Sequence, residues 1–110
     1  MIAFITELNE NNYNYFISDG SVLIYFIAEC EELCRTISPI IDEISSEYLN
    51  IKVGILNIDL LTESFNIDLY KDLGIRNIPA IVLFKDGEIV GRLIGNITKN
   101  EIVELINTYS

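Results

Sequence analysis

The chain has 110 residues and a formal net charge of −10, from seven Lys and Arg against seventeen Asp and Glu. Half of the residues are hydrophobic and 22% are charged, which is typical of a globular domain with its own core, and we expect one domain over residues 1–110. The acidic balance makes nucleic acid and anionic membranes poor partners. The sequence contains no His, which excludes Ser–His and Cys–His catalysis.

The sequence gives no indication of export or membrane insertion. The first basic side chain is Arg35, so the N-terminus lacks the positive region of a signal peptide. The longest uninterrupted apolar run, from Val22 to Ala28, is too short to span a bilayer. We therefore expect a cytoplasmic protein. In a reducing cytosol the only two cysteines, Cys30 and Cys34, indicate redox or metal chemistry, or else two small core residues.

Patterns typical of strands and of helices alternate along the chain. Runs rich in β-branched and aromatic residues predict strands at positions 2–6, 22–28, 52–58, 80–84 and 89–94. Apolar residues at helical spacing predict helices at positions 9–17, about 31–49, 61–73 and from 98 onward. The order β-α-β-α-β-α-β-β-α predicts an α/β fold with a mixed central sheet and helices on both faces.

Short motifs mark where these elements begin and end. Gly74 is a C-cap for the third predicted helix, and Asp86-Gly87 fits a type I′ hairpin turn. Thr98 and Glu101 form a capping box that opens the last helix.

The second predicted helix carries both cysteines on its apolar face. Pro39 lies inside this helix and is expected to kink it. The apolar face is predicted to consist of Cys30, Cys34, Ile37, Ile41, Ile44 and Tyr48.

Several segments of the chain resemble the thioredoxin family in order and in most of their spacing. They are residues 22–29, 37–44, 56–59, 74–80, 83–88 and Gly95. The resemblance covers nearly the whole chain and implies the thioredoxin fold, although the stretch from Asp59 to Pro79 is longer by about one helical turn. It also implies that Pro79, after Ile78, is the family's cis-proline and that these two residues and Gly95 shape a substrate groove. From the sequence alone, Pro79 is equally a loop proline and Gly95 a turn glycine.

The active-site segment departs from the family pattern. Five positions that read WCGPC in thioredoxins read CEELC at residues 30–34. Cys34 matches the family's second, buried cysteine, but Glu31 occupies the position of the nucleophilic cysteine and Cys30 that of the tryptophan before it. The family's buried aspartate, its lysine partner and another tryptophan are replaced by Tyr25, Ile55 and Ile27.

The resemblance implies an atypical thiol–disulfide oxidoreductase, in which Cys30 attacks a protein disulfide and Cys34 resolves the mixed disulfide. Such an enzyme is expected to require no organic cofactor, to take its electrons from a separate reductase and to act as a monomer. Positions i and i+4 of a regular helix place β-carbons about 5–6 Å apart, whereas a disulfide needs about 3.5–4.5 Å. The Cys30–Cys34 bond therefore requires Cys30 to lie outside regular helix geometry. The surrounding carboxylates disfavour the Cys30 thiolate and select a positively charged partner surface.

Two other hypotheses remain open at this point. The first is a redox-inactive binding or adaptor module that uses the groove beside Pro79. The second is metal or iron–sulfur ligation by the four cysteines of two chains, because two thiolates without histidine cannot complete a tetrahedral site in one chain. We expect no metal site within a single chain.

Overall fold

A five-stranded sheet forms the centre of the computed structural model, which describes residues 5–28, 32–75 and 77–109. The strands, in chain order, are β1 (Ile5–Glu7), β2 (Ser21–Ile27), β3 (Lys52–Asn57), β4 (Ala80–Lys85) and β5 (Glu88–Ile94). The helices are α1 (Tyr13–Ile17), α2 (Glu32–Glu47), α3 (Glu63–Leu73) and α4 (Lys99–Tyr109), with a short 3-10 helix η1 (Ile58–Leu60).

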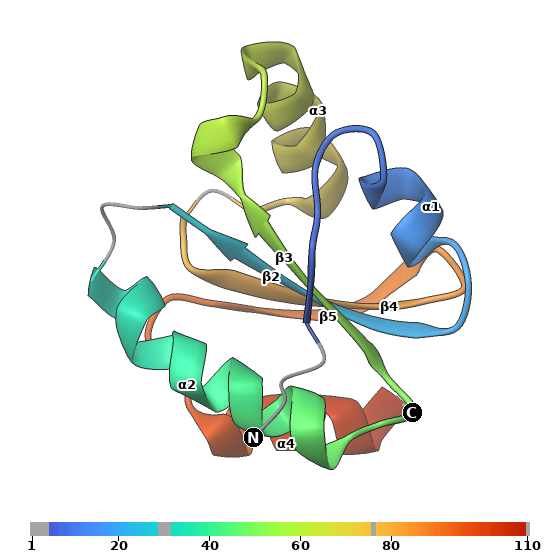
Figure 1. Ribbon diagram of the computed structural model, residues 1–110, viewed down its shortest axis with the longest axis vertical. Coiled ribbons are helices and arrows are strands. Elements are labelled where there is room, and N and C mark those ends of the chain that lie inside the picture. Colours follow the sequence, from blue (N-terminus) through green and yellow to red (C-terminus); the bar gives the residue numbers. More distant parts are fainter. Residues whose placement is uncertain (1–4, 29–31, 76, 110) are drawn as a thin grey trace.

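The sheet is mixed, with the strand order β1-β3-β2-β4-β5. Strands β1, β3 and β2 are parallel to one another, whereas β4 runs antiparallel to β2 and β5 antiparallel to β4. Helices α1 and α3 cover one face of the sheet, and α2 and α4 cover the other (Figure 1). The predicted α/β fold with a mixed sheet and helices on both faces is confirmed.

Strand β2 supplies both layers of the core. Its residues from Val22 to Phe26 are all 0% exposed, which explains their continuous apolar sequence. Because side chains alternate along a strand, Tyr25 packs under α2 and α4 while Phe26 packs under α1 and α3. We call these two cores the α2/α4 layer and the α1/α3 layer.

The predicted start and stop signals are confirmed. Gly74 ends α3 in the left-handed region, at φ 66°. Asp86 and Gly87, between β4 and β5, both have positive φ, 51° and 87°, as a type I′ turn requires. At the start of α4 the Thr98 N–H donates to Glu101 Oε1 at 2.9 Å, and the Glu101 N–H donates to Thr98 Oγ1 at 3.2 Å.

The first helix is shorter than predicted, because it begins at Tyr13 instead of position 9. Asn9 Oδ1 accepts the N–H groups of Asn11 and Asn12, and the Asn9 N–H donates to Asn12 Oδ1. These side chains accept hydrogen bonds from backbone N–H groups and form a turn, and such local bonds compete with helix formation. The prediction of a helix from Asn9 is therefore wrong.

Helix α2 carries the predicted apolar face and runs through Pro39 without a break. The face is confirmed for Cys34, Ile37, Ile41 and Ile44, which are buried. Tyr48 lies just after the end of the helix and is half-buried. The expected kink at Pro39 stays a prediction.

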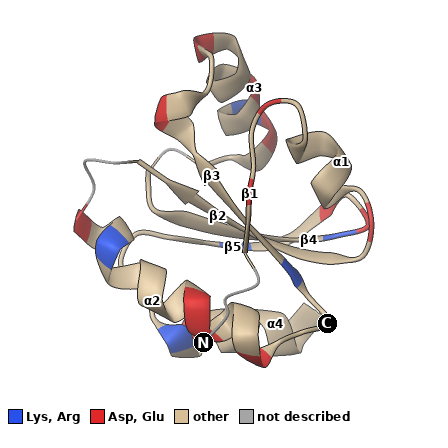
Figure 2. Cartoon of the chain, viewed as in Figure 1, with Lys and Arg blue, Asp and Glu red and all other residues tan. Residues whose placement is uncertain are grey.

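Charged residues are spread over the surface of the described chain. Figure 2 shows Lys and Arg at separate places on helices and strands, among more numerous Asp and Glu. None of the helices in the described part of the chain is long and apolar enough to cross a membrane.

Candidate active site

The strand register brings several of the predicted site residues to one edge of the sheet. Phe26, near the end of β2, pairs with Ala80, the first residue of β4, and Ala80 pairs with Ile94, the last residue of β5. Pro79 and Gly95 are therefore neighbours, and the Gly95 N–H donates to the Pro79 carbonyl oxygen at 2.9 Å. The chain leaves β2 at this same edge before it enters α2 (Figure 1).

Cys34 is the third residue of α2 and carries a free thiol. It is 5% exposed and belongs to the α2/α4 layer. The resemblance matched Cys34 to the family's buried second cysteine, and its burial is confirmed. Cys30, the predicted attacking cysteine, lies outside the described residues.

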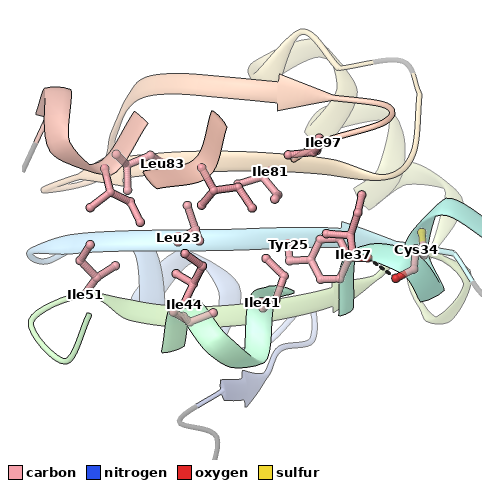
Figure 3. Packing of buried hydrophobic residues seen from close by; sticks show 13 residues of the cluster. Leu23, Tyr25, Cys34, Ile37, Ile41, Ile44, Ile51, Ile81, Leu83 and Ile97 are labelled. Carbon is pink, nitrogen blue, oxygen red and sulfur yellow. Dashed lines mark hydrogen bonds between the residues drawn. The ribbon is translucent and has the colours of Figure 1, made fainter. Parts of the chain in front are cut away.

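Tyr25 connects the sheet to the turn that carries Cys34. Its side chain is fully buried, and its hydroxyl donates to the Cys34 carbonyl oxygen at 2.6 Å (Figure 3). The Ser38 hydroxyl donates to the same oxygen at 2.8 Å. Burial raises the pKa of Tyr25 far above its usual range, the Ser38 hydroxyl partly opposes this rise, and Cys34 adds to it. Tyr25 is therefore a neutral hydrogen-bond donor in the position where thioredoxins carry an acid.

The peptide bond between Ile78 and Pro79 is cis, as the resemblance implied. Pro79 is buried, and the half-buried Ile78 packs against both core layers. Gly95 has φ +89°, and a Cβ at this position would meet nothing within 4 Å. The backbone conformation, and not a lack of space, therefore requires glycine at position 95, which agrees with its interpretation as a turn glycine. The role of Gly95 in a substrate groove stays a prediction.

Two of the family positions that are replaced here line one small hollow. Ile27 at the end of β2 and Ile55 in β3, together with Leu60 of η1, border a space of about 150 Å³. Leu60 is 80% exposed, so this side of the sheet edge presents apolar surface. The sequence analysis did not identify Leu60, because it follows Asp59 in a segment without strand or helix periodicity.

Ser38 is a second residue that the sequence analysis left without a role. It follows Cys34 by four residues, and a hydroxyl at that spacing in a helix can donate to the carbonyl four positions earlier. That spacing is the signal that could have identified it.

The described residues contain no group of three or more Cys, Asp or Glu that could hold a metal ion. Glu29, Cys30 and Glu31 lie outside those residues.

The structure defines a thioredoxin-like fold, with a cysteine in the first turn of α2 and a cis-proline directly before β4. The Thioredoxin family model matches residues 4–108. A thioredoxin of Chlamydia caviae is 34% identical over 106 residues, which are 96% of this chain and 99% of that protein. A thioredoxin of Chlamydia pneumoniae is 33% identical over 94% of this chain and 96% of its own. Thioredoxin C-2 of Corynebacterium nephridii is 32% identical over 97% of both chains.

The chain therefore belongs to the thioredoxin family.

Proposed function

We propose that the protein is an atypical thioredoxin-like thiol–disulfide oxidoreductase that reduces protein disulfides by cycling Cys30 and Cys34 between dithiol and disulfide. Family membership supports a thioredoxin-like redox protein; the reaction and its residues are our proposal. The observation that carries it is the position of Cys34, a buried free thiol in the first turn of α2, at the sheet edge that also holds the cis bond before Pro79.

In the proposed reaction the Cys30 thiolate attacks one sulfur of a substrate disulfide. A bond forms between Cys30 and that sulfur, and the other substrate sulfur leaves as a thiolate. The Cys34 thiolate then attacks Cys30, forms the Cys30–Cys34 disulfide and displaces the remaining substrate thiolate. Two electrons pass to the substrate, and the two protons from the cysteines reach its thiolates through solvent. A separate reductase restores the dithiol.

Ile78, Pro79 and Gly95 are proposed to shape the groove for an extended substrate segment. Their support is spatial: Pro79 and Gly95 share a backbone hydrogen bond, and Ile78 precedes them at the same sheet edge. The net charge of −10 and the exposed Glu32 in the first turn of α2 favour substrates with basic residues near the disulfide. We further propose a cytoplasmic monomer with one domain over residues 1–110. The reaction needs no metal or organic cofactor.

Thiol titration with mass measurement, followed by an insulin-reduction assay with dithiothreitol as the electron source, tests the proposal. The oxidised protein is expected to weigh two mass units less than the reduced protein. Cys30→Ser is expected to abolish insulin reduction. Cys34→Ser is expected to accumulate a mixed disulfide, because no thiol remains to resolve it.

The double variant Cys30→Ser/Cys34→Ser is the matched blank, because it has the same fold and no thiol. A wild-type protein with neither the two-unit shift nor activity above this blank would overturn the proposal. Visible absorbance or bound metal in the purified protein would also contradict it.

A further inference from the structure

A second hollow lies between α1 and α3, on the face of the sheet opposite α2 (Figure 1). It holds about 280 Å³, close to the lower end of small-molecule sites. Its inner side is apolar, with the buried Leu69 and Leu73 of α3. Its rim carries two exposed carboxylates, Asp68 and Asp72, which lie one helical turn apart on α3. We call this space the acidic hollow.

Aromatic rings form the wall of the acidic hollow. Tyr13 of α1 and Phe65 of α3 both line it, and their rings meet edge to face with centroids 5.9 Å apart. Tyr13 is 5% exposed, and its hydroxyl makes no hydrogen bond with any described residue. A buried phenol usually finds a hydrogen-bond partner, so this hydroxyl is a polar group that the fold itself does not use.

The Tyr13 hydroxyl faces the acidic rim. Burial, and after it the Asp72 carboxylate, raises the pKa of Tyr13 above its usual range. The effect of Asp72 requires its carboxylate to lie close to the hydroxyl, because such interactions weaken with distance. In the described part of the chain, the one fully enclosed side-chain atom without a partner is Asn66 Oδ1. The Tyr13 hydroxyl is therefore open to the hollow that its side chain lines.

The two carboxylates of the rim have no cation of their own. The ion pairs between described residues all belong to Lys99, and neither Asp68 nor Asp72 receives an ion pair or a hydrogen bond from a described group. Lys71, on the same helix, is exposed. The net charge of −10 also draws cations toward the protein. The acidic hollow is therefore suited to a positively charged ligand.

The groups that line the hollow match a primary ammonium on a short hydrocarbon chain. An ammonium has three N–H donors and no acceptor, and Asp68, Asp72 and the Tyr13 hydroxyl provide three acceptors. Aromatic rings also attract an organic cation, and the two leucines can cover its hydrocarbon chain. A metal ion fits less well, because Ca²⁺ takes roughly six to eight oxygen ligands and the described residues offer no group of three or more metal-binding side chains.

We propose that the acidic hollow binds a primary alkylammonium ion. The charged end contacts Asp68, Asp72 and the Tyr13 hydroxyl, and the hydrocarbon chain lies on Leu69 and Leu73. A free amine and the lysine side chain of a partner protein share this chemistry. The inference does not depend on the proposed function, because the hollow is lined by no thiol and lies on the other face of the sheet from the α2/α4 layer.

Titration of the isotope-labelled protein with n-butylamine at pH 7, followed by NMR, tests the proposal. The amine is a cation at this pH. Amide shifts are expected to be confined to α1 and α3 and to saturate at millimolar concentrations. The controls are n-butanol, which has the same chain without the charge, and NaCl at the same ionic strength; neither is expected to give saturable shifts there. Shifts that do not saturate, or that spread over all acidic surfaces, would overturn the proposal.

Three variants locate the binding. Asp72→Asn is expected to weaken binding of n-butylamine about fivefold, the effect of one exposed ion pair. Tyr13→Phe, which keeps the ring, is expected to weaken it about threefold. Asp42→Asn is the matched control, because it changes the net charge by the same amount at an exposed position of α2; it is expected to leave Kd unchanged. Equal weakening in Asp42→Asn and Asp72→Asn would show general electrostatic attraction and overturn the site.

Two further ligands distinguish the sources of the ammonium. Binding of acetyl-lysine amide assigns the hollow to a lysine side chain of a partner protein. Binding of putrescine, with acetyl-lysine amide excluded, assigns it to a free amine. If none of the three amines binds to the folded wild-type protein, the proposal is wrong, whereas the proposed function stands or falls independently on the insulin-reduction assay. The NMR spectrum of each variant also establishes that its fold is intact.

Discussion

Two buried tyrosines, on opposite faces of the sheet, make different contacts. Tyr25, in the α2/α4 layer, is 0% exposed and donates to the Cys34 carbonyl. Tyr13, in the α1/α3 layer, is 5% exposed and contacts aromatic rings edge-on, with centroids 5.9 Å from Phe65 and 6.3 Å from Phe84. Burial, followed by the nearby Asp72, raises the pKa of Tyr13 above its usual range.

The comparison distinguishes stabilisation by apolar packing from stabilisation by buried hydrogen bonds. The α1/α3 layer is stabilised through apolar area and ring geometry, so it tolerates the loss of a hydroxyl. The α2/α4 layer contains the thiol and the buried hydrogen bond by which Tyr25 connects α2 to the sheet. Changes of the same size are therefore expected to have larger effects in the α2/α4 layer.

The largest expected effect in this comparison comes from removing each hydroxyl in turn. Tyr25→Phe is expected to lower the free energy of unfolding by about 1–2 kcal/mol, because one buried hydrogen bond is lost while Ser38 still satisfies the carbonyl. Tyr13→Phe is expected to change it very little. Urea unfolding followed by circular dichroism measures both, and equal losses in the two variants would show that the comparison is wrong.

Removing helix N-caps is expected to give a smaller difference in the free energy of unfolding between the two layers. Thr98→Ala removes the hydroxyl that accepts the Glu101 N–H in the capping box at the start of α4 and is expected to cost about 1–2 kcal/mol. Thr62→Ala removes one bond, 3.3 Å long, to the Phe65 N–H of α3 and is expected to cost about 0.5–1 kcal/mol.

Thr108→Ala, near the end of α4, is the matched control for these two substitutions. It removes the same atoms from a hydroxyl that bonds the Glu104 carbonyl within the helix, so it is expected to have the smallest cost of the three. Thermal unfolding of all three variants ranks them, and a cost of Thr62→Ala above that of Thr98→Ala would reverse the expected order.

The smallest expected effect concerns the ion pairs between α2 and α4. Lys99 lies 2.8 Å from Glu43 and 2.9 Å from Glu47, and its hydrogen bonds to these carboxylates raise the pKa of Lys99 above its usual range. Because the pKa of Lys99 is higher in the folded state, its ion pairs contribute fully to the free energy of unfolding below about pH 10, the pKa of lysine in the unfolded chain. This contribution is lost as the pH rises through the pKa of the folded state. The pairs are exposed, so their contribution is small and declines with salt.

Lys99→Gln tests this point by urea unfolding at pH 7 and at pH 11. Lys99→Gln is expected to have a lower free energy of unfolding than wild type at pH 7. This difference is expected to shrink at pH 11 and at 1 M NaCl. Lys71→Gln on α3 is the control, because no ion pair of Lys71 is present among the described residues. A Lys99→Gln difference that stays constant with pH and salt would contradict the electrostatic explanation.

The sequence allowed much of the fold to be predicted because its signals are local. Gly74, the Asp86-Gly87 turn and the Thr98 capping box each depend on a few adjacent residues, and all three are confirmed. The start of α1 was predicted wrongly because asparagine side chains compete with the helix for backbone donors. The irregular register between β4 and β5 at Leu83 and Phe84 was also not predicted, because no turn residue marks it.

The candidate site divides in a similar way. The cis bond before Pro79 and the burial of Cys34 followed from the resemblance to thioredoxins, and both are confirmed. The bond from Tyr25 to the Cys34 carbonyl could not be predicted. It depends on which face of β2 Tyr25 occupies, on the distance between β2 and α2, and on the direction of a carbonyl close to a proline.

By itself, the sequence determined the order of strands and helices and the residues that each of them buries, because hydrophobic periodicity and capping act over a few positions of the chain. The tertiary structure alone decided which distant groups meet: the Gly95 N–H with the Pro79 carbonyl, and the Tyr25 hydroxyl with the turn of Cys34. These contacts depend on strand register and helix placement, which are set by packing of the whole sheet between its two layers of helices.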